Sequence, residues 1–259
     1  MTVIHPTAIL DPDVELGEGV RIGPYAVLGS GVKIGAWSVI GPHTVIEGEC
    51  ELGERCLVYP HAVLGTPPQD LKYRGEKTRL VFGDGSVIRE SVTVNRGTPG
   101  GGGLTSLGPN CYLMAHSHVA HDCALGREVV LANNVALAGH VTVGDCVQFG
   151  GLAGIHQFVR IGSYAFIGAG AMVRRDVPPF ALAKGDRAFI TGINRVGLER
   201  HGFSPERIEG IEALFNFIAE NGRDRLQTEL PDFACIQSDL SEVRSFLEQS
   251  KLGLCPFRS

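Results

Sequence analysis

The sequence predicts a mainly β fold, a left-handed parallel β-helix of six-residue repeats followed by a C-terminal α-helical domain. Aliphatic residues recur every six positions through most of the chain. From about residue 191 onward, the apolar residues instead follow the 3.6-residue period of a helix. A six-residue repeat is typical of a solenoid in which every repeat supplies one short strand and one turn.

The six-residue ladder has two unbroken runs, from Ile4 to Leu64 and from Leu107 to Val173. Three repeats would make one coil, so residues eighteen apart in the sequence should stack at a spacing of about 4.8 Å. The aliphatic position and the small or β-branched fifth position should point inward. Gly follows the aliphatic residue in most repeats, and we expect it to permit the backbone conformations of the corners. Sides of six residues favour left-handed winding of the coil, whereas the connection between two parallel strands is usually right-handed.

Two polar segments interrupt the ladder and predict loops at about residues 66–79 and 97–105. The first separates Leu64 from the next rung in phase, Phe82. The second contains the run TPGGGG and shifts the phase by one residue. Loops on a rigid scaffold often carry functional residues. An inserted loop without a function is an equal alternative for these two segments.

The repeat stops at Pro178-Pro179, and we place the β-helix at residues 1–190 and a helical domain at 191–259. Ser204 before Pro205 is typical of a helix N-cap followed by Pro at the first helical position. A second helix is expected over residues 238–249. The apolar face of the first helix is formed by Ile208, Ile211, Leu214, Phe215 and Ile218.

Composition narrows the classes of function. The net charge of −5 argues against a generic surface for nucleic acid or anionic membrane. No apolar stretch reaches the about 18 residues of a membrane span, and the N-terminus enters the first repeat without a signal-like segment, so we expect a cytoplasmic protein. The cysteines form neither a disulfide nor a zinc signature. Four of them occupy fifth positions and should be small core residues: Cys50, Cys56, Cys111 and Cys123.

Five of the nine histidines lie between residues 116 and 156. Repeat arithmetic places four of them along one edge within three successive coils, with Asp122 beside them: His118, His121, His140 and His156. They could be plain surface histidines, zinc ligands, or a site in which one imidazole near neutrality acts as a general base. The spacing alone does not separate zinc binding from base catalysis.

Seven motifs outside the generic repeat pattern carry a more specific signal. They are PQDLKY (68–73), IRESVTVNRGT (88–98), VAHDC (119–123), LANN (131–134), LAGH (137–140), IHQF (155–158) and GINRVGLERHGF (192–203). In this order they resemble the bacterial acyl-carrier-protein–UDP-N-acetylglucosamine O-acyltransferases, which begin lipid A synthesis. The resemblance covers nearly the whole chain, including both loops and the helical tail.

The resemblance implies a homotrimer with active sites in the clefts between subunits. An R-3-hydroxyacyl group would pass from acyl carrier protein to the 3-hydroxyl of UDP-N-acetylglucosamine, without cofactor, metal or nucleic acid. His121 would be the catalytic base, Asp122 would orient it, and the Gly139 N–H would stabilise the oxyanion. None of the cysteines needs to be a nucleophile, because the hydroxyl attacks the thioester directly.

The resemblance also assigns substrate contacts. Residues near the glucosamine and the acyl or pantetheine portion would be Gln69, Asp70 and Lys72. The same cleft would be lined by His118, His140, His156 and Gln157. The nucleotide and phosphates would meet Asn194 and Arg200, since a guanidinium suits a diphosphate. Ala169 falls where the family's acyl-chain ruler sits, and its small size favours a medium to long chain.

Other functions also fit parts of the sequence. The related N-acyltransferase of the same pathway usually carries an additional N-terminal domain, whereas this repeat begins at Ile4. A trimeric zinc carbonic anhydrase shares the solenoid, and a non-enzymatic ligand-binding solenoid would leave the clustered histidines unexplained. An acceptor with a 3-amino group would suit the same base and oxyanion site.

Overall fold

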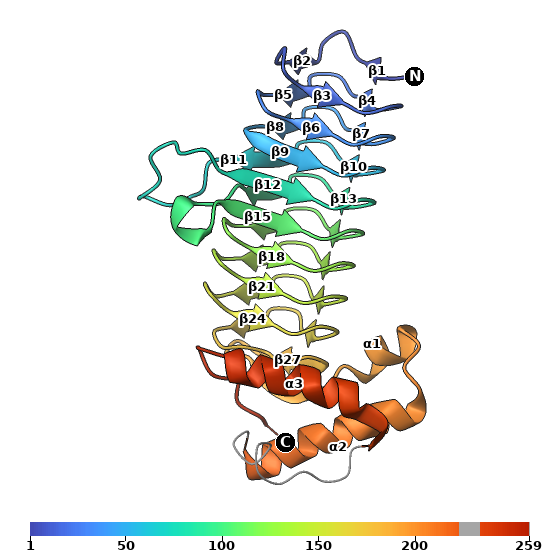
Figure 1. The fold of residues 1–259 in the computed structure, drawn as a ribbon, viewed down its shortest axis with the longest axis vertical. Helices are drawn as coiled ribbons and strands as arrows, with labels where there is room; N and C mark the ends of the chain where they lie inside the picture. The colour runs from blue at the N-terminus through green and yellow to red at the C-terminus, as the bar shows by residue number, and fades with distance from the viewer. Residues whose placement is uncertain (223–233, 259) are drawn as a thin grey trace.

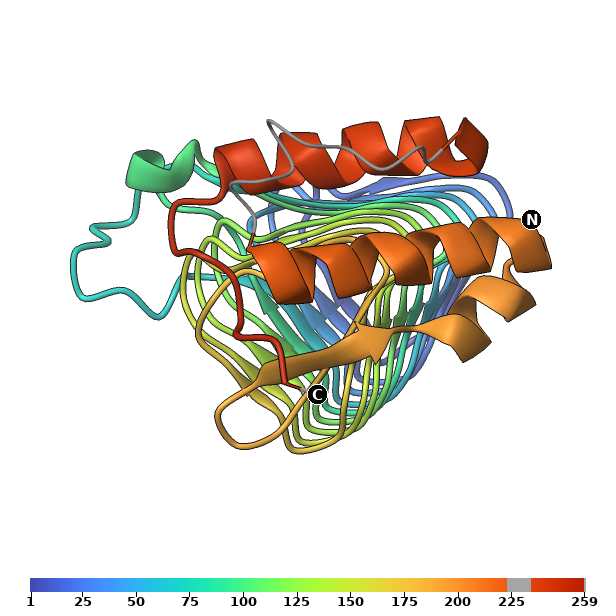
Figure 2. The ribbon, with the colours of Figure 1, turned by 90° about the horizontal axis from the view of Figure 1, so that it is seen from below.

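The computed structural model describes residues 1–222 and 234–258, and it places the six-residue repeats on the three sides of a triangular prism (Figures 1 and 2). Strands one coil apart pair in parallel and in register, as Val39 does with Arg21 on one side and Leu57 on the other. Each side of the prism is therefore one continuous sheet, and we call the three sides sheets A, B and C.

The strands are short because each side of the prism is only one repeat long. Sheet A contains β1 (Val3–Ile4), β4 (Arg21–Ile22), β7 (Val39–Ile40), β10 (Leu57–Val58), β13 (Val87–Ile88), β16 (Tyr112–Leu113), β19 (Val130–Leu131), β22 (Gln148–Phe149), β25 (Phe166–Ile167), β27 (Ala181–Lys184) and β28 (Phe189–Ile193). Sheet B contains β2 (Ile9–Leu10), β5 (Val27–Leu28), β8 (Val45–Ile46), β11 (Val63–Thr66), β14 (Thr93–Asn95), β17 (His118–Val119), β20 (Ala136–Leu137), β23 (Gly154–Ile155) and β26 (Met172–Val173). Sheet C contains β3 (Glu15–Leu16), β6 (Lys33–Ile34), β9 (Glu49–Leu52), β12 (Arg79–Phe82), β15 (Leu104–Leu107), β18 (Ala124–Leu125), β21 (Thr142–Val143) and β24 (Arg160–Ile161).

The core fills the inside of the prism with the aliphatic and fifth-position side chains, as the repeat predicted. The four fifth-position cysteines, Cys50, Cys56, Cys111 and Cys123, are all buried, which confirms them as core residues. At the N-terminal end the rung Ile4 is exposed and the rung Leu10 is only partly buried, because no further coil covers them.

The predicted reason for the glycine after each rung is wrong. The left-handed backbone falls two residues later, at the fourth position, and mostly on other residue types, such as Trp37 (φ 61°) and His140 (φ 60°). The glycine is needed because successive coils stack closely. A Cβ on Gly35 would lie 2.4 Å from the carbonyl carbon of Gly53 in the next coil.

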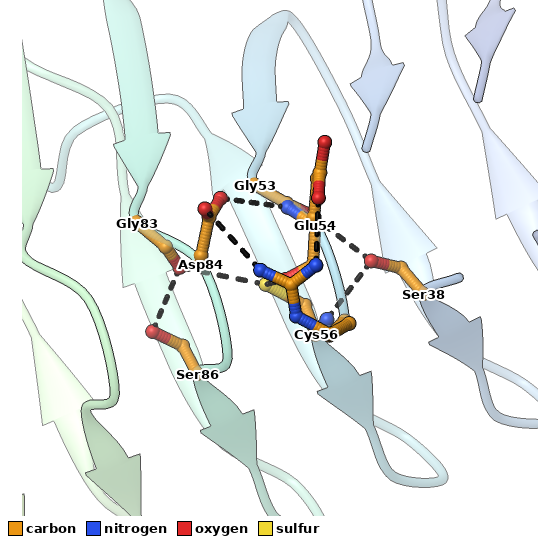
Figure 3. Close-up of polar contacts among 8 residues, drawn as sticks. Ser38, Gly53, Glu54, Cys56, Gly83, Asp84 and Ser86 are labelled. Atoms are coloured by element: carbon orange, nitrogen blue, oxygen red, sulfur yellow. Dashed lines mark hydrogen bonds and ion pairs between the residues drawn. The ribbon is translucent and has the colours of Figure 1, made fainter. Parts of the chain in front are cut away.

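Polar side chains connect the coils at the corner between sheets C and A (Figure 3). The Ser38 hydroxyl donates to the Gly53 carbonyl at 3.0 Å and accepts from the Cys56 N–H at 2.9 Å. The Asp84 carboxylate accepts from the Glu54 N–H at 2.8 Å. Backbone amides and carbonyls at this corner thus have hydrogen-bond partners, and the six-residue repeat continues without interruption.

Both interruptions of the repeat leave the prism at the corner between sheets B and C. The first connects β11 to β12, and the second, containing the 3₁₀ helix η1 (Pro99–Gly101), connects β14 to β15. In Figures 1 and 2 they project from the same edge.

The C-terminal region closes the other end of the prism. Strand β28 pairs antiparallel with β27 and crosses the predicted boundary at residue 190, so the helical part begins only at residue 195. Residues 223–233 and 259 of the predicted helical domain lie outside the described residues. The helices are α1 (Arg195–Arg200), α2 (Pro205–Asn221), η3 (Ala234–Ile236) and α3 (Gln237–Gln249).

Helix α2 crosses the open end of the prism (Figure 2), and its predicted apolar face is buried. The Ser204 side chain caps α2 by accepting from the Arg207 N–H. Arg160 of β24 donates to the Phe246 carbonyl, which fixes α3 against the last strand of sheet C. Among the described residues, no helix is long and apolar enough to cross a membrane.

We predict that Gly35→Ala lowers the free energy of unfolding by about 1–3 kcal/mol, the usual cost of overpacking. Gly100→Ala is the matched control, because no atom lies within 4 Å of its added Cβ. Denaturant unfolding followed by circular dichroism measures both. Equal stability of the two variants would contradict close coil stacking as the reason for this glycine.

Candidate active site

The turn that carries His121 and Asp122 lies at the same B–C corner as the two loops, one coil beyond η1. The next coils add Gly139–His140 and Gln157 at that corner, since β20 leads into β21 and β23 into β24. The His121 and His140 rings meet edge to face, with centroids 5.1 Å apart. The structure therefore brings these predicted residues together along one edge.

His121 is held by the carboxylate that follows it. Its Nδ1 lies 2.8 Å from Asp122 Oδ2, and the two side chains are 11% and 1% exposed. A carboxylate only accepts hydrogen bonds, so Nδ1 donates and Nε2 carries the free lone pair. The imidazole is thus fixed in orientation and tautomer, with Nε2 available to accept a proton.

Asp122 is itself held by the second loop. Thr98 donates to it twice, from its N–H at 2.7 Å and its hydroxyl at 2.6 Å. A Cβ on Gly101 would lie 2.1 Å from the Asp122 Cγ, so the loop packs tightly on the carboxylate. The Thr105 hydroxyl accepts from the Asp122 N–H at 2.8 Å. Sequence analysis missed Thr98, Gly101 and Thr105, although the phase shift in this loop marked the segment as irregular.

Gly139 lies directly against His121. A Cβ at this position would meet the His121 Nε2 at 2.8 Å and Cε1 at 2.6 Å, so only glycine leaves the ring in place. Within the described residues, the Gly139 N–H has no hydrogen-bond acceptor. The His121 Nε2 can accept a proton, and the unpaired Gly139 N–H can donate to an oxygen that becomes negative. The pair therefore suits a reaction that combines proton removal with the growth of negative charge on an oxygen.

A groove of about 400 Å³ runs down the outer face of sheet B. Its floor consists of outward residues in register on successive strands, from His118 through Ala136 and Gly154 to Met172. Because Ala136 and Gly154 are small, the face is hollowed between His118 and Met172. His156 also lines the groove, so two predicted site residues belong to it.

Burial lowers the pKa of the His118 imidazole, a backbone hydrogen bond with Thr93 opposes this shift, and nearby His121 lowers the pKa a little further. The His118 Nδ1 lies 2.7 Å from the Thr93 hydroxyl. His118 is therefore held neutral beside the groove and is suited to hydrogen bonding rather than to holding charge.

The remaining cluster residues are less constrained. The His140 ring stacks on Phe158, with centroids 4.6 Å apart, and its Nε2 is 3.7 Å from Asp122 Oδ2. His121, Asp122 and His140 are close enough to hold a cation together. Both Asp122 oxygens already accept hydrogen bonds from Thr98 or His121, and a cation bound there would compete with these bonds.

The first loop carries Gln69, Asp70 and Lys72 outward from the same corner. The Asp70 carboxylate accepts from the Lys72 N–H at 2.9 Å, which shapes the loop tip locally. Arg96 anchors the loop base by donating to the Gly65 carbonyl at 2.7 Å. In the part of the chain described, no hydrogen bond or ion pair connects these three side chains to the histidine cluster.

Three predicted residues lie away from the B–C corner. Ala169 is exposed in the turn from β25 to β26, between sheets A and B. Asn194 is 8% exposed and caps α1, accepting from the Gly197 N–H and donating to the Tyr164 carbonyl. Arg200 is exposed at the last residue of α1. A single chain does not bring them to His121.

Two protein-family models match parts of this chain, and a curated relative matches nearly all of it. A family model described as "Udp N-acetylglucosamine O-acyltransferase; Domain 2" matches residues 176–255, and one described as "Bacterial transferase hexapeptide (six repeats)" matches residues 13–48. The chain is 51% identical to the acyl-[acyl-carrier-protein]–UDP-N-acetylglucosamine O-acyltransferase of Alkalilimnicola ehrlichii, over 98% of this chain and 99% of that protein.

Two solved structures show the same fold over nearly the full length. LpxA from Acinetobacter baumannii superposes with a TM-score of 0.92 at 37% identity, covering 98% of this chain and 99% of that chain. UDP-N-acetylglucosamine O-acyltransferase from Moraxella catarrhalis gives a TM-score of 0.92 at 36% identity, covering 97% and 99%. These matches and the hexapeptide model confirm the predicted left-handed β-helix with C-terminal helices.

We predict that the lowered pKa of His118 makes the fold less stable as the pH falls below about 6.5. The unfolded chain binds a proton at His118 near that pH, whereas the folded chain binds it only at lower pH, so protonation favours unfolding in this window. His118→Gln should weaken the dependence of the melting temperature on pH there. Identical pH dependence in the two proteins, or an NMR titration of His118 at its ordinary pKa, would contradict the assignment.

Proposed function

The chain belongs to the family of acyl-[acyl-carrier-protein]–UDP-N-acetylglucosamine O-acyltransferases, which catalyse the first step of lipid A synthesis, and we propose that His121 is the general base of its reaction. The observation that carries this proposal is the arrangement around the imidazole. Asp122 fixes Nδ1 at 2.8 Å, and the free Nε2 lies against Gly139, whose N–H is unpaired within the described residues.

The reaction is a direct acyl transfer of an R-3-hydroxyacyl group. The 3-hydroxyl oxygen of UDP-N-acetylglucosamine attacks the thioester carbonyl carbon of acyl carrier protein while Nε2 of His121 takes the hydroxyl proton. The Gly139 N–H donates to the oxyanion of the tetrahedral intermediate. The intermediate then breaks its C–S bond, and the imidazolium returns the proton to the departing thiolate. No acyl-enzyme and no cofactor takes part.

Asp122 acts on the reaction through His121. Its carboxylate stabilises the imidazolium that forms when Nε2 takes the proton, and it keeps Nδ1 protonated beforehand. Thr98 donates two hydrogen bonds to that carboxylate, so the loop of residues 97–103 positions the base without touching substrate. This gives the second break in the repeat a role in catalysis.

The acyl chain is assigned to the groove on sheet B. The groove begins at His118, next to the base, and its floor of Ala136, Gly154 and Met172 is largely apolar. Apolar burial contributes about 0.8 kcal/mol per methylene, so such a floor favours an alkyl chain. His118, His140, His156 and Gln157 then line the cleft that holds the reacting groups.

A homotrimer is proposed to complete the site. Apolar side chains are exposed at the first loop and around sheet B, and a partner chain would cover them: Leu71, Leu152, Phe158 and Met172. Such exposed patches mark association surfaces. Packing a second β-helix on sheet B would turn the open groove into a cleft.

The remaining contacts are assigned from the family resemblance and the geometry of each residue. Gln69, Asp70 and Lys72 project from the first loop toward the glucosamine and the donor. Arg200, exposed at the end of α1, is the contact for the diphosphate. Asn194 positions that helix, since its side chain is occupied as the N-cap. We also propose a cytoplasmic location for the reaction.

We predict that His121→Asn lowers the rate of acyl transfer by about 10²–10⁴-fold, the usual contribution of a general base. His61→Asn is the matched control, because His61 lies two coils away in the turn from β10 to β11, at another corner, and its left-handed backbone (φ 64°) suits Asn. The assay follows transfer from R-3-hydroxyacyl carrier proteins to UDP-N-acetylglucosamine, and circular dichroism checks that both variants fold. Near-normal turnover in a folded His121→Asn variant would contradict the assignment of the base.

A further prediction concerns Ala169 as the acyl-chain ruler, acting from one protomer on the groove of the next. Ala169→Gly should shift the preferred donor toward longer chains, and Ala169→Met toward shorter ones, because the added side chain shortens the groove. Competition among donors of different length measures the preference. Unchanged preference in both variants would exclude this corner as the ruler.

A further inference from the structure

A second cluster of possible metal ligands lies at the corner between sheets C and A, away from His121. It consists of Glu128, Cys146 and His201, whose donor atoms all lie within 4.8 Å of one another. Figure 1 shows α1 beside this corner, on the opposite side from the two loops. The cluster takes no part in the acyl transfer described above.

Cys146 differs from the core cysteines in its position. Those occupy fifth positions inside the prism, whereas Cys146 occupies a fourth position, in the left-handed turn of the corner (φ 57°). Glu128 has the equivalent position one coil earlier, so the two side chains stack along the edge. The Cys146 Sγ lies 3.8 Å from Glu128 Oε2.

Glu128 is held with one oxygen facing the thiol. Its Oε1 accepts from Arg127 at 3.0 Å, and Arg127 is in turn bound to Asp145 at 3.1 Å. Asp145 also accepts from the Arg127 N–H, as Asp84 does from Glu54 in the corner of Figure 3. The carboxylate is therefore pre-positioned, and Oε2 remains directed at Cys146.

His201 comes from the C-terminal end of α1. Its ring meets Tyr164 edge to face, with centroids 5.3 Å apart, and Tyr164 follows Cys146 in the same corner column. The His201 N–H donates to the Gly197 carbonyl, and Gly202 (φ 77°) turns the chain immediately afterwards. Three separate segments thus converge with one sulfur, one imidazole nitrogen and one carboxylate oxygen.

We propose that Glu128, Cys146 and His201 bind a zinc ion that fastens the end of α1 to the edge of the β-helix. Zinc takes thiolate, imidazole and carboxylate ligands at about 2.0–2.3 Å, which places tetrahedral donors about 3.3–3.8 Å apart. The Sγ to Oε2 distance already meets this range, and the donor nitrogen of the exposed His201 lies within 4.8 Å of both of these atoms. A thiolate with an imidazole favours zinc over magnesium or calcium.

The proposed ion would do more than stabilise the fold. Helix α1 ends at Arg200, the assigned diphosphate contact, and His201 is the next residue. A metal at His201 would hold that guanidinium in a fixed place relative to the prism. Metal binding itself is independent of the acyltransferase reaction and is measured without substrate.

Cobalt(II) tests the site directly, because a cobalt–thiolate bond gives a near-ultraviolet charge-transfer band that histidines and carboxylates do not give. The full-length protein, stripped of metal by a chelator and dialysed, is titrated with Co²⁺ and then with Zn²⁺. We expect one thiolate-bound cobalt per chain, displaced by zinc, and a rise in melting temperature with Zn²⁺.

Cys146→Ser should abolish the band, whereas Cys235→Ser, which changes an exposed cysteine outside the cluster, should leave it unchanged. His201→Gln keeps the corner intact, and it should weaken binding by at least about 10-fold to 100-fold, the cost of losing even an outer contact to a metal site. Absence of the band in the wild type, or its survival in Cys146→Ser, would overturn the proposal. Binding by His121, Asp122 and His140 instead would give cobalt without thiolate character and would also overturn it.

Discussion

Close stacking of one coil on the next is the constraint on which the rest of the molecule depends. Each coil is bonded to its neighbour on all three sides, and glycines such as Gly35 bring the corners into backbone contact. Because the coil length is fixed, a position in the repeat is also a position in space. Side chains three repeats apart in sequence become neighbours along an edge. A site can therefore be formed by residues of successive coils, and no distant segment of the chain is needed to complete it.

The corner that carries His121 adds polar chemistry to this frame and gives the buried Asp122 carboxylate its hydrogen-bond partners. Asp122 is nearly fully buried, and a carboxylate in that environment is costly unless its oxygens accept hydrogen bonds. His121 and Thr98 supply those bonds from two successive turns at one corner. Gly139 and Gly101 then leave room for the side chains on either side. The site is therefore rigid, which suits the proposed general base, because such a base must meet a hydroxyl at a defined distance.

The sequence was most informative where the repeat converts distance along the chain into distance in space. It predicted the prism, its core cysteines and the gathering of His121 and His140 at one edge. It could not predict that Thr98 binds Asp122, because an inserted loop has no register to fix its path.

The interpretation of the glycines failed for a related reason. Backbone flexibility is a property of one residue, whereas the clash between Gly35 and Gly53 exists only when two coils are stacked. Likewise, β28 extends sheet A beyond residue 190 through an antiparallel pairing that the six-residue pattern does not contain.

The same rigidity keeps the residues assigned to the site on different edges of one chain. His121 is at the B–C corner, Ala169 at the A–B corner, and Arg200 on the helix beside the C–A corner. Hinge closure could unite such residues in a two-domain enzyme, but here every corner is fastened to the coils above and below it. Opposite edges of a hydrogen-bonded prism cannot approach each other. Residues on different corners can share a substrate only if another copy of the chain presents its own corner to the groove. The assigned contacts therefore need at least a second copy of the chain, and the proposed trimer would meet this need by dividing the parts of each cleft among the edges of neighbouring prisms.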